Sequence, residues 1–242
     1  MTINILGVNI AVTNMTDTIK QITDNLDKWR GKYICVSNVH TTITAYENEE
    51  YRDVQNGAVM ALPDGGPLSS YARKRGHKEA ERVTGPDLMQ EILKMSDEHN
   101  WKHFFYGSSQ DTLDKLKEAI KTGYKNVEVV GMISPPYREL TEEEDAEYIK
   151  TINAANPDFV WIGLGAPKQE IFMNAHENKI NALMLGVGAA FDYESGKLKR
   201  APQWMQKHDL EWVYRLMQDP KRLFRRYLVT NLRFIRLTRE KK

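Results

Sequence analysis

The sequence is poor in cysteine and has no long hydrophobic run. Cys35 is the only cysteine among 242 residues, which excludes an internal disulfide and a zinc site built from several cysteines, and it suits a reducing compartment. No stretch of about 18 apolar residues occurs, so we expect no transmembrane helix. Residues 1–12 lack a basic region and a small-residue cleavage site, and we therefore expect the protein to remain in the cytoplasm.

Several catalytic and metal-binding motifs are also missing. The sequence has no Asp-x-Asp triplet, no Gly-x-Ser-x-Gly nucleophile turn and no Walker phosphate-binding loop. His99 and His103 are four residues apart, but they straddle a predicted helix end and a predicted strand start, so they do not share one helix face. The sequence therefore predicts no metal site.

The charges are almost balanced overall, but they are distributed unevenly. The chain has 34 Lys and Arg against 33 Asp and Glu, yet residues 197–242 have 14 basic and 4 acidic residues, and residues 1–196 have 20 and 29. A basic segment next to an acidic body is typical of a surface that contacts phosphates of a membrane, a nucleotide or a nucleic acid, although a solvated helix face is the alternative. We predict a body over 1–196 and a basic helical appendage over 197–242.

The body alternates short apolar runs with helical patterns. This alternation predicts an α/β fold with a mainly parallel sheet flanked by helices, because parallel strands need crossover connections. The predicted strands, of which the first could also be a hairpin, are 3–12, 33–37, 58–63, 102–106, 127–132, 159–164 and 182–187. The predicted helices of the body are 16–29, 41–56, 112–121, 142–153 and 167–176.

Polar residues follow two of these apolar segments, and a third polar residue precedes a predicted helix start. Ligands of parallel sheets gather at the carboxyl ends of strands, so Asn38 could bind a ligand or could cap the next helix. Asp64 precedes two glycines and could be a general base or a helix cap. Arg82 precedes a Thr-Gly-Pro helix start and could neutralise an anion or form a surface ion pair.

One glycine-rich junction precedes a predicted helix. The strand 159–164 contains Gly163 and leads to Gly165, and Pro167, Lys168 and Gln169 form the predicted first turn. Glycines allow close approach to the backbone, and a helix start offers free N–H donors to a phosphate. The junction is not a dinucleotide-binding fingerprint, because Lys168 stands where the third glycine would be.

A second glycine-rich junction follows the last predicted strand. Gly186 and Gly188 are followed by Phe191, which occupies the place of the last glycine of a dinucleotide site, and by Asp192. Asp192 could bind a ribose hydroxyl or could only stabilise the turn.

The appendage mixes basic and apolar residues at helical spacing. A helical pattern begins near residue 201, Pro220 interrupts it, and residues 221–237 continue it. This mixture suits the interface of an anionic bilayer, but a helix packed on the body with its arginines outward is an equal alternative. A third interpretation is that some arginines face the cleft and bind a diphosphate.

The order of these motifs resembles that of the bacterial WecG/TagA/CpsF glycosyltransferase family. The resemblance extends over nearly the whole chain, from residue 3 to about residue 227. The motifs that carry it are the Asn-containing strand end at Asn38, Pro63-Asp64-Gly65, Arg82-Val-Thr-Gly, Gly163-Leu-Gly-Ala-Pro-Lys-Gln-Glu, Gly186-Val-Gly-Ala-x-Phe-Asp, Arg200-Ala-Pro-x-Trp-x-Gln, Glu211-Trp and Tyr214-Arg215.

The resemblance implies a Rossmann-like fold and a specific reaction. Family members transfer a sugar from a UDP-sugar, here UDP-N-acetylmannosamine or a related hexose or uronic acid, to a saccharide linked to polyprenyl diphosphate. The resemblance also implies inversion at the anomeric carbon, no metal or other cofactor, and peripheral attachment to the inner face of the cell membrane. It implies a role in the synthesis of a surface polysaccharide or a teichoic acid.

The resemblance assigns roles to seven positions. The proposed base corresponds to Asp64. The pocket residues correspond to Asn38, Arg82 and Gln169. The arginines of the appendage correspond to Arg215, Arg222 and Arg225.

These observations lead to one hypothesis and two alternatives. In the hypothesis, Asp64 deprotonates an acceptor hydroxyl, and the glycine-rich junctions and the appendage arginines bind the diphosphate of the donor. A peripheral membrane adaptor without catalytic activity and a nucleotide-dependent oxidoreductase are the alternatives. We expect no nucleic-acid partner, and the sequence leaves a homo-oligomer open.

Overall fold

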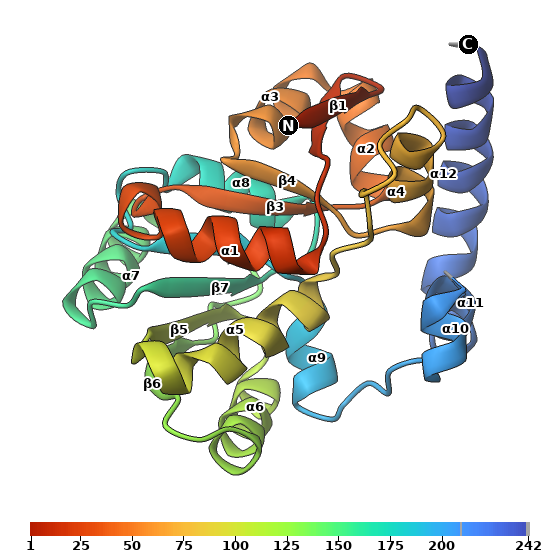
Figure 1. The fold of residues 1–242 in the computed structure, drawn as a ribbon. Coiled ribbons are helices and arrows are strands. Elements are labelled where there is room, and N and C mark those ends of the chain that lie inside the picture. Colours follow the sequence, from red (N-terminus) through yellow and green to blue (C-terminus); the bar gives the residue numbers. More distant parts are fainter. Residues whose placement is uncertain (209, 241–242) are drawn as a thin grey trace.

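The computed structural model describes residues 1–208 and 210–240, except for the side chains of Lys207, Arg222, Arg225, Arg226 and Glu240. A six-stranded sheet forms the centre of the protein (Figure 1). All of its neighbouring strands are parallel. Across the sheet, the strands are β4 (Met60–Pro63), β3 (Tyr33–Ser37), β8 (Leu183–Gly186), β7 (Phe159–Gly163), β5 (Lys102–Gly107) and β6 (Glu128–Ile133).

The predicted α/β architecture with a parallel sheet is confirmed. The N-terminal segment, predicted as a strand or a hairpin, is an antiparallel hairpin of β1 (Thr2–Ile5) and β2 (Val8–Ala11) that forms its own small sheet. The central strands are continuous apolar runs because helices cover both faces of the sheet. In β3, for example, all five residues are buried.

Two hydrophobic clusters lie on opposite faces of the sheet. Successive side chains of a strand point to opposite faces, and Ile34 and Val36 belong to the first cluster while Tyr33 and Cys35 belong to the second. Helices that contribute to the first cluster are α1 (Met15–Asn25), α5 (Gly85–His99), α6 (Gln110–Gly123) and α9 (Ala190–Glu194), and the 3₁₀ turn η1 (Asp27–Trp29) packs beside them. Helices of the second are α2 (Val39–Glu47), α3 (Glu49–Gly57), α4 (Gly66–Arg73), α7 (Glu142–Ala154) and α8 (Lys168–Ala175).

The single helix predicted over 41–56 is wrong, because this segment forms α2 and α3. Asn48 separates them in an extended conformation, with φ −127° and ψ 114°. Its side-chain oxygen accepts a hydrogen bond of 2.9 Å from the backbone N–H of Tyr51. A short amide side chain that caps a new helix in this way competes with continuation of the preceding helix.

Three helices end the chain, namely α10 (Gln203–Lys207), α11 (Glu211–Gln218) and α12 (Pro220–Glu240). The long helix α12 lies against α2 at one side of the body (Figure 1). Phe234 is buried in the second cluster, and Arg233 forms an ion pair with Glu47 at the end of α2. In the described part of the chain, no helix is both long enough and apolar enough to cross a bilayer.

Candidate active site

A cavity of about 590 Å³ lies at the carboxyl edge of the sheet. Residues at or just after the ends of five parallel strands line it, as expected for ligand sites of parallel sheets. Its size is that of a small-molecule site. Helices α11 and α12 contribute Glu211, Trp212, Arg215, Leu223, Tyr227, Thr230 and Asn231 to the opposite wall.

The structure brings most of the predicted site residues together in this cavity. Those that line it are Asn38, Asp64, Arg82, Gly163, Gly165, Gln169, Gly186, Gly188, Asp192 and Arg215. Pro167 and Lys168 are not among the lining residues. Lys168 is exposed, and its ammonium nitrogen lies 5.6 Å from the centre of the Tyr137 ring at the cavity rim. The side chains of Arg222 and Arg225 are outside the described part of the structure.

Asp64 directly follows β4 and is not a helix cap. Helix α4 begins at Gly66 with Gly65 as its cap residue, and no side chain caps this end. The backbone N–H of Asp64 donates to the carbonyl oxygen of Ser37 over 2.7 Å, which joins the ends of β4 and β3. The carboxyl group of Asp64 therefore faces the cavity without serving the helix.

The pKa of Asp64 is raised from 3.8 to about 7. Burial is the largest cause, because it disfavours the charged carboxylate. The positive charges of Arg82 and Arg215 act in the opposite direction, and the negative charges of Glu211 and Asp87 add to the increase. A carboxyl group that titrates near neutral pH is well matched to accept a proton from a hydroxyl group.

Asn38 caps α2, as its position suggested, and it also lines the cavity. Its side-chain oxygen caps α2 by accepting from the backbone N–H groups of His40 and Thr41, at 3.0 and 3.2 Å. The Thr41 hydroxyl accepts in return from the backbone N–H of Asn38 at 2.8 Å. This capping box fixes the rotamer of a side chain that also lines the cavity.

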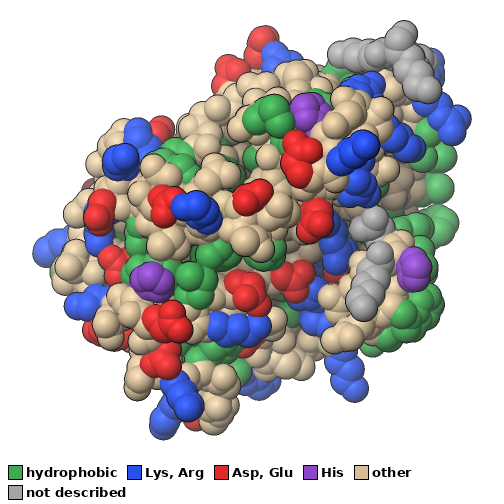
Figure 2. Space-filling view, viewed as in Figure 1, with side chains coloured by type: hydrophobic (Ala, Val, Ile, Leu, Met, Phe, Trp, Pro, Cys, Tyr) green, Lys and Arg blue, Asp and Glu red, His purple; other side chains and the backbone are tan. Residues whose placement is uncertain are grey.

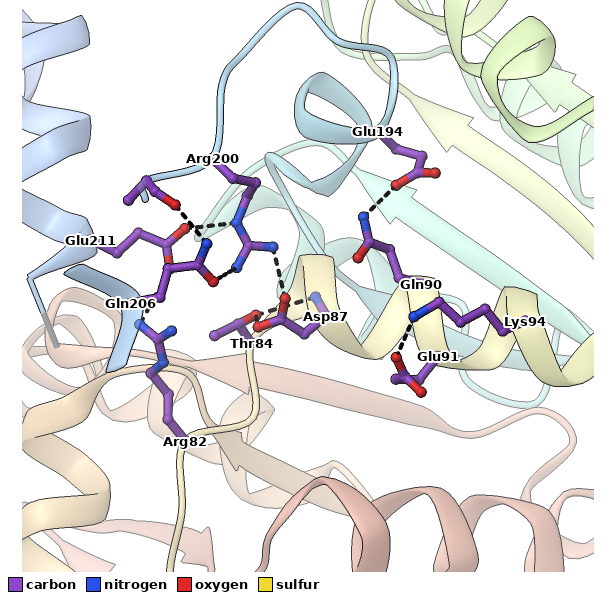
Figure 3. Close-up of polar contacts among 11 residues, drawn as sticks. Arg82, Thr84, Asp87, Gln90, Glu91, Lys94, Glu194, Arg200, Gln206 and Glu211 are labelled. Carbon is purple, nitrogen blue, oxygen red and sulfur yellow. Dashed lines mark hydrogen bonds and ion pairs between the residues drawn. The ribbon is translucent and has the colours of Figure 1, made fainter. Parts of the chain in front are cut away.

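Arg82 belongs to a network that connects the appendage to the body (Figure 3). Its guanidinium group lies 3.3 Å from a carboxylate oxygen of Glu211. Arg200 donates to the other oxygen of Glu211 over 2.9 Å, to Asp87 over 2.8 Å and to Gln206 over 3.0 Å. The pair of Arg82 and Glu211 is 17% and 12% exposed, so it is an ion pair in the cavity wall and not a surface pair.

Asp87 anchors this network at the start of α5. Burial acts to raise the pKa of Asp87, but hydrogen bonds from Arg200 and Thr84 outweigh it, so the pKa lies below its usual value. Thr84 is the N-cap residue of α5, and its hydroxyl accepts from the backbone N–H of Asp87. The carboxylate of Asp87 therefore holds the segment before α10 against the body.

Of the appendage arginines that the sequence predicts for the site, Arg215 has a described side chain, and it lines the cavity. The guanidinium carbon of Arg215 lies 5.7 Å from the centre of the Tyr193 ring, and that of Arg200 lies 5.4 Å from it. Such cation–π contacts orient a guanidinium group while its N–H donors stay available. Arg215 and Tyr193 both line the cavity, so this arginine can contact a bound anion.

Packing or backbone conformation requires a glycine at three positions of the two glycine-rich junctions. A Cβ atom on Gly163 would lie 2.7 Å from the ring of Phe191. Gly165 and Gly188 have φ angles of +76° and +54°, which side chains rarely allow. At the start of α8, where the sequence predicts a phosphate site, the backbone N–H of Gln169 donates to the carbonyl of Gly165 over 3.0 Å.

Several lining residues were not predicted from the sequence. Tyr193 immediately follows Asp192, and Tyr137 lies in the loop after β6. Tyr227 and Asn231 are four residues apart on α12 and face the cavity with Leu223. For the residues of α12, the signal that could have found them is this stripe of an apolar, an aromatic and a polar residue at i, i+4 and i+8 within a basic helix.

The ring of His103 packs against Phe159 and Trp161 of the first hydrophobic cluster. Its Nδ1 accepts from the indole N–H of Trp161 at 3.1 Å, and its Nε2 lies 2.7 Å from the hydroxyl of Ser96. That hydroxyl donates to the carbonyl of Ile92, so the ring is neutral with its proton on Nε2. Among the described residues, no three or more His, Cys, Asp or Glu are grouped to hold a metal ion.

A comparison with known protein families decides the classification. The model of the Glycosyl transferase WecG/TagA/CpsF family matches residues 3–242. The chain belongs to this family. The match agrees with the resemblance that the strand-end motifs predict, and it spans both the parallel sheet and the appendage of this WecG/TagA/CpsF family protein.

Curated relatives give the chemistry of similar proteins. The chain is 30% identical over 220 residues to an N-acetylglucosaminyldiphosphoundecaprenol N-acetyl-beta-D-mannosaminyltransferase of Bacillus subtilis (strain 168), covering 90% of this chain and 83% of that protein. A Bacillus spizizenii protein of the same name is 31% identical over 83% of this chain and 76% of its own length. One from Staphylococcus aureus (strain MW2) is 29% identical over 92% and 87%.

Proposed function

We propose that this protein transfers N-acetylmannosamine from UDP-N-acetylmannosamine to N-acetylglucosamine linked to undecaprenyl diphosphate. The observation that carries the proposal is the pKa of Asp64, which is about 7. This carboxyl group lies in the cavity, where the charges of Arg82 and Arg215 act to lower its pKa. The names of the curated relatives support the acceptor and the transferred sugar. A place in the synthesis of a cell-wall polymer or surface polysaccharide follows.

Asp64 acts as the general base in a single displacement. Its carboxylate removes the proton of an acceptor hydroxyl, and the oxygen attacks the anomeric carbon from the face opposite the UDP group. The bond between this carbon and the diphosphate breaks at the same time, so the configuration inverts and UDP leaves. General-base assistance contributes roughly 10²–10⁴-fold to such a reaction.

Positive charge stabilises the departing diphosphate. Arg215 lies in the wall formed by the appendage, and Arg82 lies in the wall formed by the body. Fixed cations placed where negative charge develops lower the barrier without reorganisation. In this proposal they take the role that a metal has in other transferases, and Arg222 and Arg225, from the same appendage, add to them.

We assign catalysis to residues 1–196 and completion of the cavity to the appendage 197–242, which also contacts the anionic inner face of the membrane. Several large apolar side chains of α11 and α12 are exposed, and they gather at the edge of the molecule where these helices lie (Figure 2). They are Trp212, Met217, Phe224, Leu228, Val229, Leu232 and Ile235. With the basic residues of the same segment, this surface suits an anionic bilayer that holds a lipid-linked acceptor.

The release of UDP tests the proposed reaction. The purified protein is mixed with a short-chain polyprenyl-diphosphate N-acetylglucosamine acceptor and a panel of UDP-sugars, with and without EDTA. We expect rapid UDP release with UDP-N-acetylmannosamine, dependence on the acceptor, and no loss with EDTA. Absence of acceptor-dependent UDP release with every donor would reject the proposal, and reduction of NAD(P) would favour the oxidoreductase alternative.

Vesicle sedimentation tests the membrane contact. We expect binding to vesicles with anionic lipids, weaker binding to neutral vesicles, and a loss of at least tenfold when Phe224 and Leu232 are both replaced by Ser. Ile171→Ser is the matched control, because Ile171 is similarly exposed but lies on α8. Equal binding by the double variant would refute the membrane role, and a wild-type dimer that the double variant breaks would assign this face to self-association.

A further inference from the structure

Gln169 lines the cavity, and its amide oxygen has no hydrogen-bond partner among the described residues. Its side chain is 4% exposed and lines the cavity. The amide oxygen is buried and makes no hydrogen bond among the described residues. It lies beside the end of β8, 3.5 Å from where a Cβ atom of Gly188 would be. A buried acceptor without a partner is costly, and a ligand that brings a donor removes this cost.

Glu170 fixes the orientation of the Gln169 amide, so that the amide oxygen is the end left without a partner. The amide nitrogen of Gln169 donates to a carboxylate oxygen of Glu170 over 2.8 Å. Rotation of the amide by 180° would place its oxygen against that carboxylate oxygen, and two acceptors at this distance repel each other. Glu170 is fully buried, so water does not weaken this preference.

The second carboxylate oxygen of Glu170 accepts from the end of a chain of buried hydrogen bonds. The hydroxyl of Tyr51 donates to this oxygen over 3.0 Å, and the amide of Gln55 donates to that hydroxyl over 2.9 Å. The hydroxyl of Ser37 donates to the oxygen of Gln55 over 2.5 Å. Burial and the charge of Glu170 raise the pKa of Tyr51, so Tyr51 remains a donor. Every described bond in this chain thus points its proton toward Glu170.

We infer that Glu170 is a positioning residue that makes Gln169 an obligatory hydrogen-bond acceptor for an O–H or N–H group of the sugar nucleotide. This inference rests on the proposed function and adds a specificity determinant to it. The donor group has two possible sources, the sugar (a hydroxyl or the acetamido N–H) and the UDP part (a ribose hydroxyl or the uracil N–H). A site built to accept from such a group discriminates strongly against ligands that lack it.

The test compares Glu170→Gln with Tyr51→Phe. Both changes alter the same buried chain by replacing or deleting polar atoms, but only the first lets the amide of Gln169 turn around. Dissociation constants for UDP and UDP-N-acetylmannosamine are measured by calorimetry, together with the melting temperature. We expect Glu170→Gln to weaken binding by about tenfold or more and Tyr51→Phe by less than threefold, even where their melting temperatures fall equally.

The two ligands identify the source of the donor group. Weaker binding of UDP-N-acetylmannosamine alone assigns the donor to the sugar, and weaker binding of both ligands assigns it to the UDP part. Equal effects of Glu170→Gln and Tyr51→Phe, or no effect of Glu170→Gln, would overturn the inference. Failure of the wild type to bind either ligand would overturn the proposed function as well.

A double-mutant cycle separates positioning from a direct role of Glu170. In a Gln169→Met background, which lacks the amide, Glu170→Gln should cause no further loss of binding, because Glu170 acts only through Gln169. Additive losses would refute this. If Glu170→Gln does not fold, Glu170→Asp withdraws the carboxylate from the amide while keeping its charge, and the same cycle applies with the same expected outcome.

Discussion

Replacement of Asp64 by Asn should strongly slow turnover and stabilise the protein at the same time. Burial raises the pKa of Asp64 from 3.8 to about 7, so the folded protein disfavours the carboxylate that the reaction needs. Below pH 3.8 the carboxyl group is protonated in both the folded and the unfolded state, and the free energy of unfolding has its full value. As the pH rises from there through about 7, the unfolded state ionises more easily than the folded state, and the free energy of unfolding falls. Asn is neutral at every pH and avoids this loss.

The pKa shift of Asp64 gives the size of the expected stabilisation by Asp64→Asn. About three pH units at ~1.4 kcal/mol each give an upper limit of ~4 kcal/mol, and solvent in the cavity reduces this to roughly 2–4 kcal/mol. We therefore expect Asp64→Asn to match the wild type near pH 4 and to exceed its free energy of unfolding by that amount near pH 8. For a domain of this size, the melting temperature would rise by roughly 4–16 °C.

Urea unfolding at both pH values, followed by tryptophan fluorescence, measures this gap. Asp53→Asn, on the exposed surface of α3, is the control, and it should show no gap that depends on pH. In parallel, UDP release by Asp64→Asn should fall by roughly 10²–10⁴-fold while the dissociation constant for UDP stays within about threefold. A gap of equal size at pH 4 and pH 8, or near-normal turnover, would refute the assignment of Asp64 as a base with a raised pKa.

Three further changes test the framework around the site. Gly107→Ala should destabilise the protein by about 3 kcal/mol in urea unfolding, because a Cβ atom at this φ of +120° would lie 2.7 Å from the backbone of Gly163; wild-type stability would contradict this packing. Arg200→Ala should speed proteolysis within α10 and α11 at least tenfold, since it breaks the ion pairs that hold them; unchanged cleavage would show that other contacts hold these helices. Burial lowers the pKa of His103 to about 3, so the free energy of unfolding of the wild type should fall by up to ~1.4 kcal/mol per pH unit as the pH drops below 6.5. The free energy of unfolding of His103→Asn should depend less steeply on pH, and equal pH dependence of the two proteins would contradict the burial of a neutral ring.

Local chemistry was enough to predict the strand ends that form the site. Asn38, Asp64 and Gly163 were assigned to one edge because parallel strands end at the same side of a sheet, and all three line the cavity. The rule requires only the correct strand type and direction. These follow from short apolar runs alternating with helical patterns, which depend on neighbouring residues alone.

The first turn of α8 marks the limit of such reasoning. The sequence predicts Pro167, Lys168 and Gln169 as one phosphate-binding group, but Lys168 is exposed while Gln169 and Glu170 are buried. Neighbouring residues of a helix point about 100° apart, so the direction in which α8 leaves the sheet decides which of them enters the cavity. That direction is set by packing against β3, β8 and α3.

The family, the parallel sheet and the strand-end residues can thus be derived from the order of residues along the chain, since each depends on local pattern. Contacts between distant segments cannot. The ion pair of Arg82 with Glu211 and the hydrogen bond of Tyr51 to Glu170 join residues more than 100 positions apart. They exist because the strand order 4-3-8-7-5-6 and the return of α11 and α12 bring those segments together. The pKa of Asp64 has the same origin, because burial and charge at one atom are properties of the folded chain.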